Sequence, residues 1–394
     1  MKKTYKFRIF PTKAQQTSLE ETLELCRWTY NQTLAHRKNS YEKEGKSVSK
    51  YDTNLLLPYW KEQNPELKSV FSQVLQNVQE RVDLAFQAFF RRVRNHENPG
   101  YPRFKGRGRY DSFTYPQTGF GLKDNGTVLL SKIGEIKIKL HRQIEGKIKR
   151  LTIGRTTRGK WFATFFVEQE NPVPISRKTN LVTGIDLGLE SFATFSDGLK
   201  IENPRFFRLE EQILAKTQSK RDKLPKGSSE RFKATKVIRR IHERIVNKRD
   251  NFAHQLSYDL VSRFSIICFE DLDIKSMLHN GTRGLSKSIS DASWNLLLRL
   301  TSYKAESAGS KVVFIDPRNT SQMCSDCGML VPKDLGTRVH KCPYCGLVMD
   351  RDRNAALNIL RLGLQALIDG GSNDLPVRLG LQSVGFKAVE ARSL

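Results

Sequence analysis

Cys324-Ser-Asp-Cys327, Cys342-Pro-Tyr-Cys345 and Asp350-Arg-Asp352-Arg-Asn354-Ala-Ala make up the stretch around which this sequence is organised. The two Cys-x-x-Cys pairs stand 14 residues apart, and an acidic pair follows within seven residues of the last cysteine. Each pair is followed by a glycine that suits a tight turn, so together they supply the four thiolates of a closed tetrahedral zinc site. Because cysteine fills every ligand position, the predicted role of Zn²⁺ is structural. A redox-active dithiol is the alternative.

The composition points to a partner of negative charge. The chain has 394 residues, which suggests two or three domains. Its 67 Lys and Arg residues against 41 Asp and Glu residues give a formal net charge of +26, an excess that is typical of nucleic-acid-binding proteins. A membrane partner is not expected, because we find no run of about 18 apolar residues and no signal peptide. We expect the protein in the cytoplasm, associated with the nucleoid.

The first half of the chain predicts a small antiparallel β-barrel interrupted by helices. The segment Tyr5-Lys-Phe-Arg-Ile9 alternates apolar and basic residues, which indicates a half-buried strand. Apolar residues at three- and four-residue steps predict one helix after Thr12, capped together with Gln15, and a second helix over residues 67–95. Alternating segments between residues 110 and 170 add the remaining strands.

Three groups of side chains are candidates for nucleic-acid contact. Amides in the second helix could read adenine edges, the Arg-rich, aromatic loop after it suits phosphate contact and stacking, and a basic helix between residues 205 and 250 suits a phosphate backbone. A solvated helix face or loop is the alternative for each group. The candidates are Gln73, Gln76 and Asn77 in the helix, Arg103, Lys105 and Arg107 in the loop, and Arg239, Arg240 and Arg244 in the basic helix.

After a linker at residues 171–176, the second half of the chain predicts an α/β domain. A short apolar strand ends at Asp186, and a hairpin follows with its turn at Asp197-Gly198. Two further buried strands are expected at residues 265–270 and 311–315, with a helix from about Asp291 to Ala308 between them. This order of elements is the opening of an RNase H-like sheet.

Three carboxylates stand at the ends of these predicted elements. Asp186 and Glu270 each end an apolar strand, and Asp352 leads into the final helix. In an RNase H-like sheet the first and fourth strands are neighbours and the last helix packs across them, so the three acids can converge. Three such carboxylates and a phosphate can hold two divalent metal ions that support hydrolysis of a phosphodiester. On these grounds alone Asp271 competes with Glu270, and Asp350 competes with Asp352.

The combined motifs resemble a known family. They are Gly184-Ile-Asp-Leu-Gly188, Phe269-Glu-Asp-Leu272, Asn319-Thr-Ser-Gln-Met-Cys324-Ser-Asp-Cys327-Gly328 and Asp350-Arg-Asp-Arg-Asn-Ala-Ala356. These motifs are similar to those of TnpB, the transposon-encoded RNA-guided DNA nuclease (OrfB of insertion sequences) that is related to type V CRISPR effectors. The resemblance covers nearly the whole chain and selects Glu270 and Asp352 over their neighbours.

The family implies the activity and its partners. It implies a guide RNA made from the transposon end, cleavage of double-stranded DNA beside a short transposon-adjacent motif, and a catalytic metal that is Mg²⁺ or Mn²⁺. The expected oligomeric state is a monomer. The fold class that follows is a multidomain α/β protein whose RuvC-like nuclease carries an inserted zinc ribbon. The expected domains are a wedge barrel (1–24 and 100–175), a helical recognition insertion (25–99), a RuvC-like nuclease (176–322 and 347–370), the zinc ribbon (323–346) and a mobile tail (371–394).

A function without cleavage is the main alternative. The chain could be an RNA-guided repressor, or a DNA-binding accessory of transposition. A nuclease-dead relative is expected to have lost one of the acids, whereas Asp186, Glu270 and Asp352 are all present. The sequence therefore favours the endonuclease.

Overall fold

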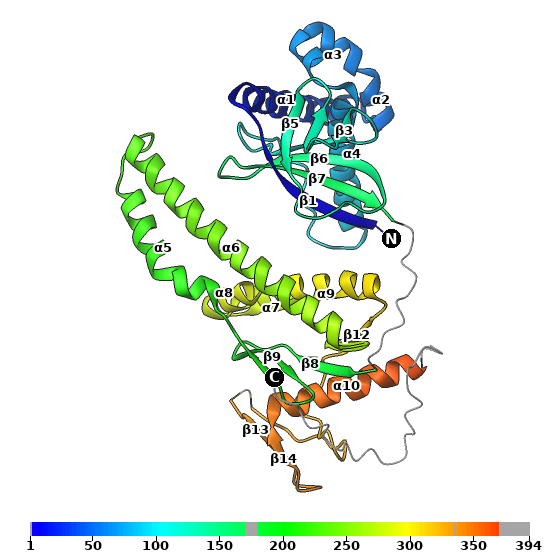
Figure 1. The fold of residues 1–394 in the computed structure, drawn as a ribbon, viewed down its shortest axis with the longest axis vertical. Coiled ribbons are helices and arrows are strands. Elements are labelled where there is room, and N and C mark those ends of the chain that lie inside the picture. Colours follow the sequence, from blue (N-terminus) through cyan, green and yellow to red (C-terminus); the bar gives the residue numbers. More distant parts are fainter. Residues whose placement is uncertain (1, 170–179, 335, 370–394) are drawn as a thin grey trace. The chain divides into compact units, whose positions relative to one another are not determined.

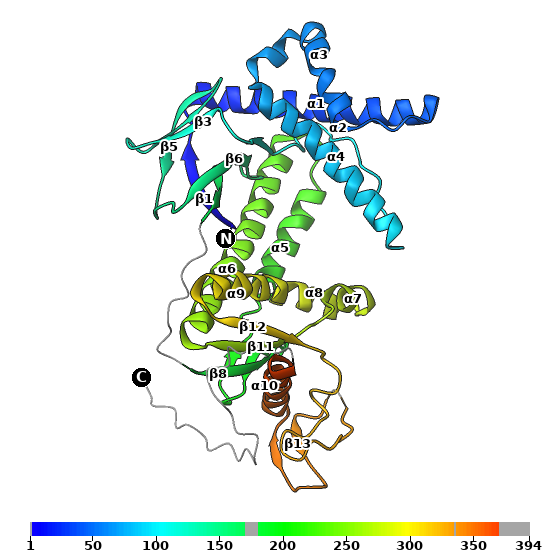
Figure 2. The same cartoon turned by 90° about the vertical axis from the view of Figure 1, so that its right-hand side faces the viewer.

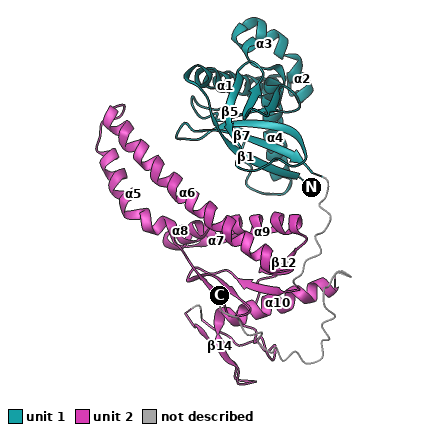
Figure 3. Ribbon diagram, in the orientation of Figure 1, with its two compact units in different colours: residues 1–171 teal, residues 172–394 magenta. Residues whose placement is uncertain are grey.

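The computed structural model describes residues 2–169, 180–334 and 336–369, and the chain divides into two compact units, residues 1–171 and 172–394 (Figure 3). The predicted linker, residues 171–176, and the predicted mobile tail, residues 371–394, lie outside the described residues. Of the helices that are described, none combines the length and the apolar character that a membrane-spanning segment requires.

The first unit is built on one antiparallel sheet. Its strands are β1 (Lys2–Phe10), β2 (Ser112–Tyr115), β3 (Phe120–Lys123), β4 (Thr127–Leu130), β5 (Gly134–Lys139), β6 (Lys147–Arg155) and β7 (Trp161–Glu168). They pair in the order β2-β6-β7-β1-β5-β4-β3. Strands β2 and β3 are the two edges, so the predicted barrel is a partly closed sheet. Alternate residues of β1 and β7, such as Phe7 and Phe165, face the core, as the period of two requires.

Helices of the first unit pack against this sheet (Figure 1). They are α1 (Lys13–Glu44), α2 (Lys50–Leu55), α3 (Leu57–Gln63), the 3₁₀ helix η1 (Pro65–Ser69) and α4 (Ser72–Arg94). The predicted capping box is confirmed, since the Thr12 hydroxyl accepts from the Gln15 N–H and the Gln15 side chain accepts from the Thr12 N–H. The predicted start of the second long helix at residue 67 is wrong, because Val70 is extended and α4 begins only at Ser72.

A five-stranded sheet forms the centre of the second unit. Its strands are β8 (Val182–Asp186), β9 (Ser191–Phe195), β10 (Lys200–Glu202), β11 (Ile266–Glu270) and β12 (Lys311–Ile315), in the order β10-β9-β8-β11-β12. Strands β8, β11 and β12 are parallel, whereas β9 and β10 are antiparallel to their neighbours. Every residue of β11 is buried. Strand β12 lies at the sheet edge and is only half-buried, with Phe314 exposed, so the prediction of a buried strand there is wrong.

Six helices belong to the described part of the second unit. They are α5 (Phe206–Asp222), α6 (Ser229–Arg263), α7 (Ile274–Asn280), α8 (Arg283–Ala292), α9 (Trp294–Ala308) and α10 (Arg351–Asp369). Ser293 adopts a left-handed conformation with φ of 56° and separates α8 from α9, so the helix predicted from Asp291 begins instead at Trp294. The last helix begins at Arg351, which places Asp352 inside its first turn.

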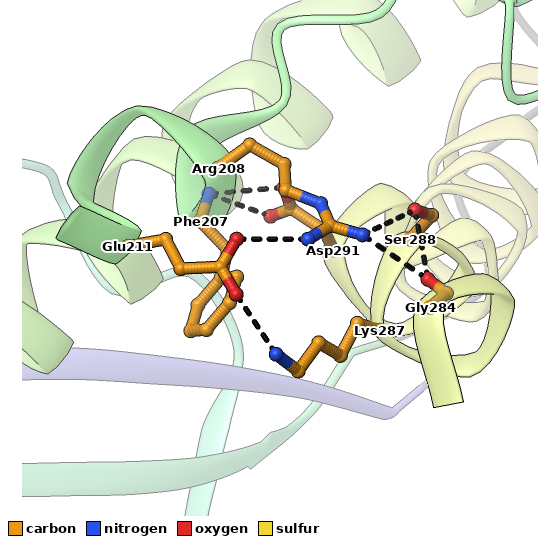
Figure 4. A network of polar contacts seen from close by, with 7 residues as sticks. All are labelled: Phe207, Arg208, Glu211, Gly284, Lys287, Ser288 and Asp291. Atoms are coloured by element: carbon orange, nitrogen blue, oxygen red, sulfur yellow. Dashed lines mark hydrogen bonds and ion pairs between the residues drawn. The ribbon is translucent and has the colours of Figure 1, made fainter. Parts of the chain in front are cut away.

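Asp291 fastens the hairpin of α5 and α6 to α8. Its carboxylate accepts from the Phe207 N–H at the start of α5, at 2.9 and 3.0 Å, and from the Arg249 guanidinium of α6 at 2.7 Å. Figure 4 shows Glu211 on the same junction, bonded to Arg208 and to Lys287. A buried carboxylate that caps one helix and pairs with a second sets the angle at which the hairpin leaves the sheet.

The last helix packs closely on the sheet at a glycine. Helix α10 lies across β8 and β11 (Figure 2). A Cβ atom on Gly184 of β8 would lie closer than 3.0 Å to the Ala356 carbonyl oxygen and to the Leu360 nitrogen. The small residues of α10 and the missing side chain at Gly184 together allow backbone to approach backbone, which explains why this strand position holds glycine.

The fold predicts that Gly184→Ala lowers the free energy of unfolding of the second unit by about 3 kcal/mol. The added Cβ would clash with the backbone of α10, which cannot move aside as a flexible side chain could. Thermal unfolding followed by calorimetry measures this. Gly284→Ala is the matched control, since Gly284 lies in α8 with nothing within 4 Å of the added Cβ, and it is expected to be neutral or stabilising by up to about 1 kcal/mol. Equal unfolding temperatures for the two variants would contradict the packing argument.

Candidate functional site

The four cysteine sulfur atoms lie within 4.8 Å of one another. The Cys324 and Cys345 sulfurs are 3.6 Å apart, and those of Cys327 and Cys342 are 3.5 Å apart. These separations exceed the S–S bond length of about 2.05 Å, so the thiols are free. Among the residues that the structure describes, this is the single group of three or more potential ligands gathered to hold one ion.

The two knuckles share one backbone geometry. In the first, the Cys324 N–H donates to the Met329 carbonyl and the Gly328 N–H donates to the Cys324 carbonyl. The second repeats both bonds with Cys342 and Gly346 in the matching positions. Both glycines have φ of 78°, a left-handed value that glycine adopts without strain. Two identical turns present four sulfurs to one point, as a tetrahedral ion requires.

The backbone also favours thiolate at Cys342. Burial acts to raise the pKa of this thiol, but the N–H groups of Cys345 and Tyr344, together with hydrogen bonds to the Cys327 and Cys345 thiols, lower its pKa to about 6. The same cluster raises the pKa of Cys345 to about 12, because its thiol shares protons with the other three. A thiol that ionises below neutral pH binds a metal cation without first having to give up a proton. The donor set therefore fits a divalent ion that prefers sulfur ligands.

Buried amides of α10 tie the cysteine cluster to the sheet. Asn354 accepts from the Ser325 N–H at 2.9 Å and donates to the Met323 carbonyl at 2.7 Å. Asn358, one turn later, donates to the carbonyls of Met323 and Thr320 at 2.7 and 2.9 Å. Both amides are fully buried, and they fix the segment that enters the first knuckle. The short strands β13 (Val339–Lys341) and β14 (Val348–Asp350) pair beyond it and lead back into α10.

Asp186 and Glu270 are neighbours at the ends of parallel strands. Ile185 of β8 lies opposite Phe269 of β11, so the next residue on each strand is a carboxylate. Asp352 approaches the same strand ends from the first turn of α10. The structure therefore brings the three predicted acids to one end of the sheet. Glu270 is 8% exposed, whereas Asp186 and Asp352 are half-buried.

Burial raises the pKa of all three acids, and neighbouring negative charges add to this effect at Asp186 and Asp352. Desolvation, followed by the charges of Glu270 and Asp352, raises the pKa of Asp186 to about 8. Desolvation also raises the pKa of Glu270, against a hydrogen bond from Thr320, and it raises the pKa of Asp352 together with the charge of Asp350. Like charges held together out of water cost folding energy, and such groups are typical of functional sites.

Asp350 has a different environment from Asp352. Its carboxylate accepts from the N–H groups of Asp352 and Arg353, which caps α10, and from the Lys200 ammonium at 2.8 Å. Although burial opposes them, these bonds lower the pKa of Asp350. Asp350 is thus held as a charged cap, and Asp352 is the acid that faces the strand ends.

The candidate amide side chains on α4 differ in how many hydrogen bonds they already make within the protein. The Gln73 side-chain oxygen accepts from the Thr118 hydroxyl at 3.1 Å, whereas Gln76 is exposed. Asn77 donates to Glu80 and accepts from Arg81, so both ends of its amide are used within the helix. Of the three, Gln76 is the side chain best placed to meet a partner.

The basic candidates are largely solvent-exposed. Arg103 and Arg107 are exposed, while the backbone of Lys105 between them is fastened to α1 by Asn31 and Arg27. In the second unit, Arg239, Arg240 and Arg244 project from α6, and Arg244 pairs with Glu210 at 3.3 Å. A loop with a fixed backbone and free cationic ends suits phosphate contact.

Sequence reasoning missed the polar side chains that connect the two centres. These are Thr320, Asn354 and Asn358. Lys200, which pairs with Asp350 beside the acids, was missed as well. A partial signal exists, because Asn354 and Asn358 stand four residues apart in a helix whose neighbouring positions, Ala355 to Ile359, are mostly apolar. Buried amides at that spacing need partners on one facing segment.

Three family models match parts of the chain. They are described as a helix-turn-helix domain (residues 1–46), a "Probable transposase" of the OrfB type (residues 164–281) and a Cas12f1-like TNB domain (residues 294–359). In this chain the first of these regions holds β1 and the single long helix α1.

Similar proteins span almost the whole chain. A protein of Streptomyces pristinaespiralis named for RNA-guided DNA endonuclease activity is 35% identical over 93% of this chain and 90% of its own length. A protein of Escherichia coli K12 named in the same way, InsQ, is 29% identical over 93% of each chain. A solved Cas12f1 complex with single guide RNA and target DNA shares the fold, with a TM-score of 0.53, at 15% identity over 89% of this chain and 83% of that one.

The cysteine geometry predicts that Cys342→Ser lowers the zinc content from about one ion per chain to a small fraction, because three sulfurs do not close the tetrahedron. The same substitution should lower the free energy of unfolding of the second unit by several kcal/mol, since zinc binding contributes to folding. Metal analysis of the purified protein and thermal unfolding measure both effects. Tyr344→Ser is the matched control, being an exposed side chain in the same knuckle. Full zinc content in Cys342→Ser would show that the cluster is not the binding site.

The raised pKa of Asp186 predicts a pH dependence of stability in buffer without Mg²⁺. The folded state keeps a proton that the unfolded state releases above its ordinary pKa of 3.8, so stability falls as pH rises from about 4 to about 8. Asp186→Asn should flatten this decline and raise the unfolding temperature at pH 8 by several degrees, roughly 2–4 °C per kcal/mol. Asp259→Asn is the control, because Asp259 is an exposed carboxylate on α6, and this variant should show the same decline as wild type. An equal slope of stability against pH in wild type, Asp186→Asn and Asp259→Asn would refute the raised pKa of Asp186.

Proposed function

Because this chain belongs to the TnpB (OrfB) family of RNA-guided DNA endonucleases, we propose that its second unit is a RuvC-like nuclease in which Asp186, Glu270 and Asp352 are the catalytic carboxylates. The observation that carries the proposal is the convergence of these acids on adjacent strand ends and the first turn of α10. Their raised pKa values support it, since nothing in the packing of the unit benefits from three desolvated carboxylates at one end of the sheet.

The topology supports the RuvC-like assignment. Three strands, β10-β9-β8, form antiparallel hairpins, and β11 and β12 extend the sheet in parallel on the other side of β8. This is the 3-2-1-4-5 strand order expected for an RNase H-like sheet. The segment with the four cysteines stands between the last strand and the last helix, as an inserted zinc ribbon. The partly closed sheet of the first unit corresponds to the wedge, with α1 to α4 supplying the helical recognition insertion.

Two kinds of metal suit the two centres. The four thiolates suit Zn²⁺ in a structural role, because no ligand position is left open. The carboxylates suit Mg²⁺ or Mn²⁺, which prefer oxygen ligands. The three acids are not gathered around one point as the sulfurs are, so further oxygen ligands would come from water and from a phosphate of the substrate. When bound, the ions would supply an activated water and charge stabilisation at the leaving oxygen.

The substrate is double-stranded DNA selected by a guide RNA, which we propose is made from the transposon end. Exposed cations such as Arg103, Arg107 and Arg240 would contact phosphates of the RNA or of its hybrid with DNA, independently of sequence. We propose that α4 reads a short transposon-adjacent motif in the DNA, with Gln76 as the first candidate because its amide is exposed. The enzyme would act on the DNA of the nucleoid as a monomer.

The proposal predicts that the protein, expressed with its downstream locus and supplied with Mg²⁺, cleaves plasmids. Each plasmid carries a target that matches the guide RNA, next to a randomised flanking sequence. Asp186→Ala should lower the cleavage rate by at least about 10³-fold, because one ligand of the catalytic ions is lost, while guide RNA still co-purifies. Sequencing of cleaved plasmids and of the bound RNA gives the motif and the guide.

Asp197→Ala is the matched control, because Asp197 is an exposed carboxylate in the turn after β9, and it should cleave at the wild-type rate. Cleavage by Asp186→Ala would refute the catalytic assignment. Guide-dependent binding without cleavage by the wild-type protein, with every flank tested, would favour the repressor instead.

A further inference from the structure

A buried threonine connects the segment before the first knuckle to a catalytic carboxylate. Thr320 is 2% exposed, and its hydroxyl oxygen lies 2.5 Å from Oε1 of Glu270. Fifty residues separate the two in sequence, so the contact is tertiary. Among the described residues, the Thr320 hydroxyl is the hydrogen-bond partner of the Glu270 side chain, and none of these residues bonds to Oε2.

The hydroxyl has a choice of two acceptors. Besides Glu270, the Pro317 carbonyl oxygen lies 3.0 Å away, and a hydroxyl has one proton to donate. A carboxylate is the stronger acceptor, and the shorter distance belongs to it. The threonine therefore donates to Glu270 when that acid is ionised, which is the form that binds a cation.

The position of Thr320 is fixed from both sides by a short segment, residues 319–324, which we call the strap. At its start, Asn319 has φ of 62°, and its carbonyl accepts from the N–H groups of Gln322 and Met323 to close a tight turn. Asparagine tolerates this left-handed conformation better than most residues. Next to the turn, the Thr320 carbonyl accepts from Asn358 of α10.

The strap ends at the cysteine cluster. Its last residue is Cys324, and the Met323 carbonyl before it accepts from both Asn354 and Asn358. Lys333, beyond the first knuckle, donates to the Ser321 carbonyl at 2.7 Å. Turn, helix and knuckle thus hold the backbone of Thr320 at both ends, so its hydroxyl has little freedom to leave the carboxylate.

We propose that Thr320 is a positioning residue of the nuclease: it fixes the rotamer of Glu270 through Oε1 so that Oε2 is directed at the divalent cation, before nucleic acid binds. This inference rests on the proposed function of Glu270 and extends it to a residue whose side chain touches neither substrate nor metal. Hydrogen bonds to ligand carboxylates of this kind affect metal affinity by about 10- to 100-fold. A merely structural threonine would affect stability instead.

The test measures binding of Mn²⁺ to the full-length protein, free of nucleic acid and with zinc on the cysteines, by the loss of the free-ion signal in electron paramagnetic resonance. The site is defined as the binding lost in Asp186→Ala. Thr320→Val should weaken it at least about tenfold, and Thr320→Ser, which keeps the hydroxyl, should bind within about twofold of wild type. Thr301→Val is the matched control, because Thr301 is also fully buried in the second unit but donates to a backbone carbonyl.

Cleavage at varied Mg²⁺ gives a second, independent readout. Thr320→Val should need about tenfold more Mg²⁺ for half-maximal cleavage and should recover most of the rate at saturation, whereas a structural defect would lower the rate at every concentration. If Thr320→Val does not fold, Thr320→Ala, which adds no methyl group beside the carboxylate, replaces it in both measurements.

The outcomes separate the inference from the function on which it rests. Wild-type affinity for Mn²⁺ in Thr320→Val, or the same loss in Thr320→Ser, overturns the positioning role. So does the absence of Asp186-dependent Mn²⁺ binding in wild type, because the site would then not be arranged before nucleic acid binds. In each case guide-dependent cleavage by the wild-type protein would leave the nuclease function standing, and its failure would refute that function instead.

Discussion

Gly184 lies where α10 crosses β8, and the missing side chain lets the backbone of the helix touch that of the strand. The position of the helix follows from this contact, and the position of Asp352 follows from the helix. A side chain at Gly184 would move the axis of α10 away from the sheet, and the acid in its first turn would move with it. Asp186 and Asp352 therefore depend on a contact between groups that carry no chemistry themselves.

The charge of the site acts against the fold that holds it. Desolvation raises the pKa of Asp186, Glu270 and Asp352, and neighbouring negative charges raise the pKa of Asp186 and Asp352 further. A site of this kind therefore destabilises the unit when its acids ionise. Nearby groups reduce this loss of stability, because they form hydrogen bonds and ion pairs with the ionised acids. Lys200 and the helix N–H groups keep Asp350 charged as a cap, and the Thr320 hydroxyl favours the ionised form of Glu270. A local arrangement that is costly for stability is expected where function requires it.

The sequence predicts the features that depend on local pattern. Cysteine spacing, the glycine after each knuckle and apolar runs that end in acids can be recognised from adjacent residues. The family motifs favour Glu270 and Asp352 over the acids next to them. Breaks such as Ser293 are harder to predict, because a left-handed serine has no composition signal. The role of Thr320 could not be found, since its partner is 50 residues away in sequence. Amides such as Asn77 attract attention by type alone, and only the structure shows that this one is engaged within its own helix.

One helix serves both the cysteine cluster and the three carboxylates by using different faces. At about 100° per residue, Asp352 and Ala356 lie within roughly 40° of each other around α10, on the side that meets the sheet, whereas Asn354 and Asn358 lie on a separate face that meets the strap. The strap returns from the cysteine cluster to Glu270 through Thr320. The acids, the helix and the cluster thus form a closed ring of contacts made of packed backbone and buried amides. Because the binding energy of a structural zinc ion is folding energy, we expect the loss of one sulfur ligand to loosen this ring locally and so to displace the acids.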